Sequence, residues 1–133
     1  MFFNDHFGKY KRDSSGSAAA GYVYGRRFAS AGSTDEFNYS GLPDSSKWGY
    51  ETGNSGWGNN ELQFYTGKRI NNAHVSKGLL TINAVKENYQ GAAYTSARLI
   101  SKDKGNWKYG RIEVRAKLPG GRGIWPAIWM IAT

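Results

Sequence analysis

The sequence of 133 residues predicts an all-β fold. Several short runs alternate apolar and polar residues with a period of two, the pattern of strands that bury one face. Gly and Asn clusters separate these runs, as turns separate the strands of a sandwich or barrel. No segment shows the i, i+3, i+4, i+7 spacing of an amphipathic helix. We therefore expect a β-sandwich or barrel.

The two clearest strands are predicted by strict alternation. Residues 111–118 place four apolar side chains on one face and four charged ones on the other. Leu80, Ile82 and Ala84 alternate in the same way, directly after a turn at Lys77-Gly78. Each run predicts a strand with one buried face.

Three more runs complete the expected strands. Residues 61–66 and 94–101 are rich in β-forming residues. Residues 123–131 form an apolar, Trp-bearing run that predicts an interior strand. Pro126 within it cannot donate a ladder hydrogen bond, which indicates a bulge or a sheet edge instead.

The first 34 residues differ from the rest. Residues 14–20, SSGSAAA, have the composition of a linker, and only GYVYGRRF at 21–28 suggests a short strand. We predict an irregular leader or linker over residues 1–34 and a β domain over 35–133. With about five visible strands and an apolar run close to Thr133, we expect that domain to be an incomplete N-terminal portion of a larger one.

Composition excludes several classes of site. There is no Cys, and His6 and His74 are the only histidines, so thiolate chemistry and multi-histidine metal centres are excluded. No apolar run approaches the length of a membrane span, and the N-terminus shows no apolar core before a cleavage site, so no signal peptide is visible. Nucleotide-binding Gly loops, HExxH and EF-hand motifs are also missing.

The net charge of +8 is unevenly distributed. Residues 35–61 carry one basic and five acidic groups, whereas residues 62–133 carry twelve basic and three acidic groups. Basic groups interleaved with aromatic rings are typical of nucleic-acid surfaces. No basic run exceeds two residues, however, so we favour solvated strand faces and expect no nucleic acid, membrane or protein partner.

Trp125 and Trp129 are candidates for sugar binding. Four residues apart in one strand, they lie on the same side, about 13 Å apart at roughly 3.3 Å per residue. Aromatic faces at that spacing can each hold one sugar unit. Because Trp is usually well buried, the alternative that both are core residues is slightly favoured on spacing alone.

Asn59, Asn60 and Arg98 are weaker candidates. The two asparagines follow the Gly-rich loop 53–58, where amides bind hydroxyls but more often cap a turn. Arg98 is one charge in a strand-like run, and a simple outward-facing Arg is the favoured interpretation. Glycoside hydrolysis also needs two carboxylates about 5–9.5 Å apart, and none of the ten acids forms such a pair by local spacing. A pair assembled across strands stays open.

Four strings together carry a resemblance to a known family. GWGNNELQ at 56–63, SARL at 96–99, YGRIEVRAKLP at 109–119 and GRGIWPAIWM at 121–130 occur in this order. From about Asp35 to Ile131 the sequence resembles glycoside hydrolase family 16, and in particular the laminarinase-type endo-1,3-β-glucanases. The resemblance implies a concanavalin-like jelly-roll β-sandwich with a substrate cleft on its concave face.

The resemblance also implies roles for particular residues. It places Trp125, Trp129, Arg98 and either Asn59 or Asn60 along the sugar-binding cleft. No cofactor is implied for the chemistry. A structural Ca²⁺ away from the cleft would be held by Glu36 of the DEFN string and the carbonyl of Gly78, with a third ligand beyond this sequence.

The implied activity is retaining hydrolysis of laminarin-type β-1,3-glucan by double displacement. Members carry the catalytic motif E-x-D-x-x-E on the strand after WPAIWM, and these 133 residues contain no such motif. We therefore predict glucan-binding residues but no catalytic residue here, and no activity from this chain alone. The alternative is a non-catalytic β-glucan-binding module. An extracellular location is expected from the family, and mixed-linkage glucan is a further possible ligand.

Overall fold

The computed structural model describes residues 2–7, 19–24, 34–106 and 109–131, with side chains described from residue 34 onward. Every regular element in this part of the chain is a strand, so the all-β prediction is confirmed. None of these residues forms a helix capable of crossing a membrane. The strands are β1 (Phe2–Phe7), β2 (Ala19–Tyr24), β3 (Gly49–Glu51), β4 (Gln63–Tyr65), β5 (Ala73–Ser76), β6 (Leu79–Tyr89), β7 (Ala92–Ser96), β8 (Arg98–Ile100), β9 (Arg115–Lys117) and β10 (Ile124–Trp129).

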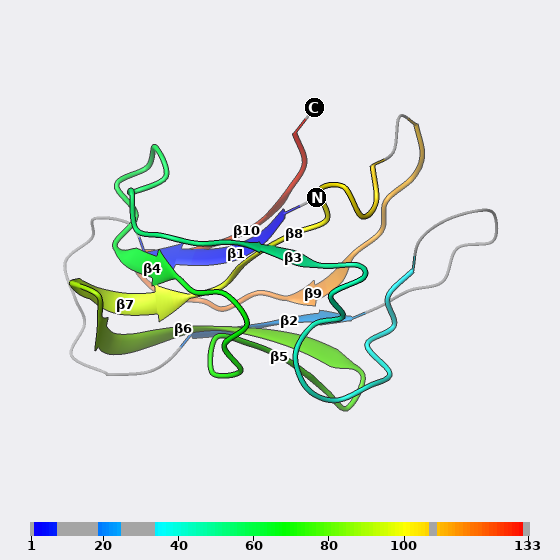
Figure 1. The fold of residues 1–133 in the computed structure, drawn as a ribbon, viewed down its shortest axis with the longest axis horizontal. Coiled ribbons are helices and arrows are strands. Elements are labelled where there is room, and N and C mark those ends of the chain that lie inside the picture. The colour runs from blue at the N-terminus through cyan, green and yellow to red at the C-terminus, as the bar shows by residue number, and fades with distance from the viewer. Residues whose placement is uncertain (1, 8–18, 25–33, 107–108, 132–133) are drawn as a thin grey trace.

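The strands form two sheets that pack face to face. One sheet has four strands in the order β10-β1-β8-β3, and the other has the order β4-β7-β6-β2-β9, with β5 also paired to β6. Figure 1 shows β10, β1, β8 and β3 in one layer and β5, β6 and β2 in the layer beneath. The chain passes between the sheets at the fully buried Ala97, between β7 and β8.

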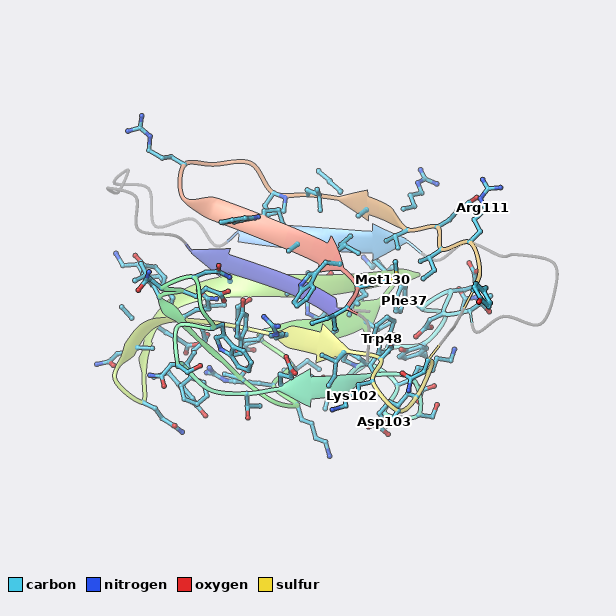
Figure 2. All side chains as sticks on the ribbon, turned by 90° about the horizontal axis from the view of Figure 1, so that it is seen from above. Phe37, Trp48, Lys102, Asp103, Arg111 and Met130 are labelled. Carbon is cyan, nitrogen blue, oxygen red and sulfur yellow. The ribbon has the colours of Figure 1, made fainter. Side chains whose placement is uncertain are left out.

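The apolar faces of both sheets meet in one core. Leu80 and Ile82 of β6, with Val75 of β5, pack in the same cluster as Leu99 of β8. The predicted inward set of Leu80, Ile82 and Ala84 is therefore confirmed, because all three are buried. Phe37 and Trp48, side by side in Figure 2, close one end of this core with their ring centroids 6.4 Å apart.

Two hairpins are formed by short turns. Lys77 and Gly78 link β5 to β6 with φ of +53° and +75°, and Gln90 and Gly91 link β6 to β7 with φ of +47° and +83°. Two successive residues with positive φ are the signature of a type I′ turn, whose twist matches that of the strands. The predicted turn at Lys77-Gly78 is confirmed.

Three sequence predictions need correction. The leader is not irregular throughout, because β1 pairs with β8 and β10, and β2 pairs with β6 and β9. Backbone pairing with the neighbouring strands holds these two segments extended, although their own sequences show little alternation of apolar and polar residues. The remainder of residues 1–33 lies outside the described residues, and the boundary at 34 stays a prediction.

The other two corrections concern the extent of one strand and the position of another. Of residues 111–118 only 115–117 form a strand, since only these pair with β2, and Ile112 and Leu118 are exposed. Among the described strands β10 pairs with β1 alone, so it lies at the edge of the described sheet and not in its interior. That position agrees with Pro126, whose ring removes a ladder donor.

Candidate functional site: an aromatic platform around Arg98

Arg98 lies at the centre of the outer face of the four-stranded sheet. Its neighbour Leu99 points into the core, so Arg98 points away from it. Glu51 of β3 stands directly opposite Arg98, and the Arg98 Nε donates to Glu51 Oε2 at 2.6 Å. Only 8% of Arg98 is exposed. Arg98 therefore faces outward, as the favoured interpretation held, but neighbouring side chains cover it.

Aromatic rings cover the Arg98 guanidinium. The Trp57 ring centroid lies 4.6 Å from Arg98 Cζ, and those of Trp129 and Tyr65 lie at 5.1 and 6.0 Å. A cation over an aromatic face within about 6 Å is attracted by the ring quadrupole. Arg98 therefore fixes rings from the 53–60 loop and from β10 next to each other, although they lie 72 positions apart in the sequence.

Trp125 and Trp129 share this face. Ala127 of β10 stands opposite Asn4 of β1, which stands opposite Arg98 of β8. Residues directly opposite in a ladder lie on one face, and so do residues two apart in a strand. Trp125 is 61% exposed and Trp129 is half-buried, so the favoured assignment of both to the core is wrong. We call Trp57, Arg98, Trp125 and Trp129 the aromatic platform.

The 53–60 loop brings Trp57 and Asn59 to the platform. Backbone hydrogen bonds between Gly53 and Tyr65 close the loop, at 3.0 and 2.9 Å. The Asn59 amide donates to Glu61 Oε1 at 3.2 Å and to the Trp57 carbonyl at 3.5 Å. Asn60 is also exposed and has φ of +54°. Of the two predicted asparagines, Asn59 is the one whose amide is oriented by this network.

The predicted metal ligands lie away from the platform in the fold. Glu36 precedes the core residue Phe37, and Gly78 is in the β5–β6 turn. Asp35 fixes the backbone here, since its carboxylate accepts from the Phe37 amide at 3.1 Å and from Trp48 Nε1 at 2.8 Å. Buried Oε1 of Glu36 has no hydrogen-bond partner, and such an orphaned carboxylate oxygen fits a role as a cation ligand. Within the described residues, no cluster of three or more His, Cys, Asp or Glu side chains surrounds a cation position.

Comparison with known proteins identifies relatives. The chain is 60% identical over 98 residues to the "Beta-glucanase" of Rhodothermus marinus, covering 74% of this chain and 34% of that protein. It is 46% identical over 102 residues to the "Glucan endo-1,3-beta-glucosidase" of Cryptopygus antarcticus, covering 73% of this chain and 36% of that one. The chain is a homologue of the laminarinase-type β-glucanases. It spans about a third of the length of these relatives.

A solved structure and a shorter match add to this homology. The X-ray structure of the laminarinase from Rhodothermus marinus matches this chain with a TM-score of 0.56 and 56% identity. The match covers 57% of this chain and 30% of the laminarinase chain. This likeness confirms the predicted jelly-roll sandwich over the matched part. The "Beta-1,3-glucan-binding protein" of Penaeus monodon is 57% identical over 37 residues, 28% of this chain and 10% of that protein. No model of a protein family matches the sequence.

Sequence reasoning missed three contributors to the site. Trp57, Glu51 and Glu61 were not predicted as site residues, yet Trp57 and Glu51 contact Arg98, and Glu61 orients Asn59. The available signal for Trp57 was a large ring flanked by glycines in the 53–58 loop. The pairing of Glu51 with Arg98 had no local signal, because it depends on the β3–β8 register.

Proposed function

We propose that this chain supplies part of the glucan-binding face of a retaining endo-1,3-β-glucanase of glycoside hydrolase family 16. The observation that carries the proposal is the stack of Trp57, Arg98 and Trp129 beside the exposed Trp125. Homology to proteins named as β-glucanases supports a glucan ligand. The folded sheet holds the rings before a ligand arrives, so little ordering cost falls on binding.

The platform suits a pyranose polymer chemically. Ring faces of Trp pack against the C–H faces of glucose units, and the nearby Asn59 amide hydrogen-bonds hydroxyl groups. Arg98 orients two of the rings while its charge is neutralised by Glu51 at 2.6 Å. Residues of this chain therefore bind and orient the glucan.

Bond cleavage in this proposal belongs to a carboxylate pair outside these 133 residues. Glu51 and Glu61 already hold Arg98 and Asn59, so we assign them no proton transfer or nucleophilic attack. Retention needs a nucleophile and an acid/base about 5–5.5 Å apart. We expect the chain alone to release no reducing sugar from laminarin, and measurable release would contradict this assignment.

Binding is tested by co-sedimentation with insoluble 1,3-β-glucan, and cellulose serves as the control polymer. We expect retention on the 1,3-glucan and its loss in Trp129→Ala. Equal partition of wild type and Trp129→Ala, or no retention of wild type, would overturn the proposed function.

A non-catalytic β-glucan-binding module is the second candidate. The match to the glucan-binding protein of Penaeus monodon favours it. Sequencing the source reading frame beyond codon 133 separates the two candidates. A continuation into E-x-D-x-x-E supports the hydrolase, whereas a continuation lacking both Glu residues supports the binding module.

We also propose that Glu36 and the Gly78 carbonyl contribute to a structural Ca²⁺ site. The orphaned Glu36 Oε1 supports this, because oxygen atoms are the ligands that Ca²⁺ prefers. We expect Ca²⁺ to raise the melting temperature of wild type and not of Glu36→Gln; an equal response of both proteins would rule out this ligand. An extracellular location is proposed as well, since polymeric glucan is met outside the cell.

A further inference from the structure

We propose that Glu61 is a positioning residue of the glucan-binding face, acting through Asn59. This proposal rests on the proposed function. Glu61 is 6% exposed and follows directly after the 53–60 loop. It is one of the few buried acidic side chains in the described part of the chain, and its carboxylate joins the loop to β4.

Three side chains donate to the Glu61 carboxylate. Asn59 Nδ2 donates to Oε1 at 3.2 Å, while Gln63 Nε2 and the Tyr65 hydroxyl donate to Oε2 at 2.9 and 2.7 Å. Hydrogen bonds to an ionised acceptor are among the strongest in proteins. One oxygen therefore orients the exposed Asn59 amide, and the other ties the carboxylate to the buried strand.

The loop that Glu61 holds has an unfavourable backbone conformation. Trp57 and Asn60 have φ of +47° and +54°, a region that a bulky residue such as Trp rarely adopts. Such conformations persist only where surrounding contacts fix them. Here the Gly56 carbonyl accepts from the Asn59 and Glu61 amides at 2.9 and 3.1 Å. The Glu61 main chain and side chain thus both stabilise the loop.

Tyr65 connects this network to the platform. Its hydroxyl donates to Glu61, its ring meets the Trp57 ring edge-on at 5.7 Å, and its centroid lies 6.0 Å from Arg98 Cζ. Glu61 therefore fixes the polar and the aromatic side of the same surface. This arrangement explains a buried charge that neither the core nor a catalytic step requires.

The substitution Glu61→Gln keeps the volume of the side chain, so it tests whether Glu61 orients the Asn59 amide. With its carbonyl oxygen toward Gln63 and Tyr65, the new amide nitrogen faces Asn59 Nδ2, and two donors cannot pair. We expect the Asn59 amide to turn over and present Oδ1 inward, which inverts what it offers to a sugar hydroxyl. Loss of about one hydrogen bond predicts about tenfold weaker binding.

The experiment measures binding of a linear 1,3-β-linked glucose hexasaccharide by calorimetry for wild type, Glu61→Gln, Asn59→Ala and the double variant. We expect Glu61→Gln to weaken binding about tenfold in wild type and not at all in the Asn59→Ala background. Glu87→Gln is the matched control, because Glu87 bonds Arg69 and Thr95 and should leave affinity unchanged. An equal loss in both backgrounds, or none in either, would overturn the proposal.

A measurement without ligand separates this proposal from the proposed function. The ¹⁵N and ¹H shifts of the Asn59 side-chain amide should change in Glu61→Gln and not in Glu87→Gln. Unchanged Asn59 shifts would overturn the role of Glu61. If the Asn59 shifts change in Glu61→Gln but the wild-type protein binds no hexasaccharide, the glucan function is refuted, while Glu61 remains the residue that orients Asn59. Glu61→Asp is the second variant if Glu61→Gln does not fold, because its shorter side chain keeps the charge but withdraws from Asn59.

Discussion

Strand β8 contributes adjacent residues to two regions that are held together in different ways. Leu99 is fully buried in an apolar core with Leu80 and Val75, where stability comes from removal of apolar surface from water. Arg98 lies on the opposite face, where Glu51 and the rings of Trp57 and Trp129 hold it. The core depends on volume, whereas the platform depends on the orientation of a few groups.

This difference separates stability from ligand binding. A packed core responds to any loss of volume, because its neighbours collapse only in part. The platform exposes Trp125 and half-exposes Trp57 and Trp129, so its rings contribute less to folding and remain accessible to a ligand. Substitutions in the core should therefore lower stability and leave ligand binding unchanged. Substitutions of the platform rings should lower ligand binding with a smaller loss of stability.

The largest effect is expected from Leu80→Ala in the core. A fully buried Leu replaced by Ala costs about 2–5 kcal/mol of unfolding free energy, which urea denaturation measures. The fraction that remains folded should bind 1,3-glucan like wild type. If the folded fraction also loses glucan affinity, the separation between core and platform is wrong.

An intermediate effect is expected from Arg98→Lys. The ammonium cannot stack between two indole rings, so we expect a loss of about 1–2 kcal/mol of stability and a change in the near-UV circular dichroism of the Trp residues. Arg122→Lys, at an exposed position, is the control and should change neither. Identical spectra and stabilities for the two variants would show that Arg98 does not organise the rings.

The smallest effect concerns pH and lies outside the platform. Hydrogen bonds from Arg69 and Thr95 hold the pKa of the Glu87 carboxyl below its usual range. A lowered folded-state pKa gives stability that is present above the unfolded-state pKa and is lost as the pH falls through the folded-state pKa. Wild type should melt slightly above Glu87→Gln at pH 7, and the difference should vanish in acid. A difference that persists at pH 2 would contradict this cause.

Much of the fold was predictable because the core leaves a periodic pattern. Leu80, Ile82 and Ala84 alternate, and Gly78 in the Lys77-Gly78 turn is the residue type that positive φ favours. The strand at 111–118 was predicted too long, because alternation reports a suitable face and not whether a partner strand lies alongside. β1 was missed for the converse reason, since its pairing with β8 and β10 joins segments about 100 residues apart.

The platform was predicted only in part. Trp125, Trp129 and Arg98 were candidates from their residue types, and the family resemblance placed them along a cleft, whereas spacing alone favoured a core role for both Trp residues. Their true face is fixed by the register from β10 through β1 to β8, which no local pattern encodes. Trp57 reaches Arg98 by a strained loop conformation that the sequence indicates only as a Gly-rich turn.

The central claim is that the aromatic platform binds 1,3-β-glucan. Calorimetry with the linear glucose hexasaccharide on Trp125→Ala tests it most directly, with Tyr109→Ala as the control because Tyr109 is an aromatic residue 85% exposed elsewhere on the surface. Loss of one stacked ring predicts an affinity decrease of about 1–2 kcal/mol, with unfolding free energy within about 0.5 kcal/mol of wild type. An equal affinity for wild type and Trp125→Ala, or an equal loss in Tyr109→Ala, would contradict the claim.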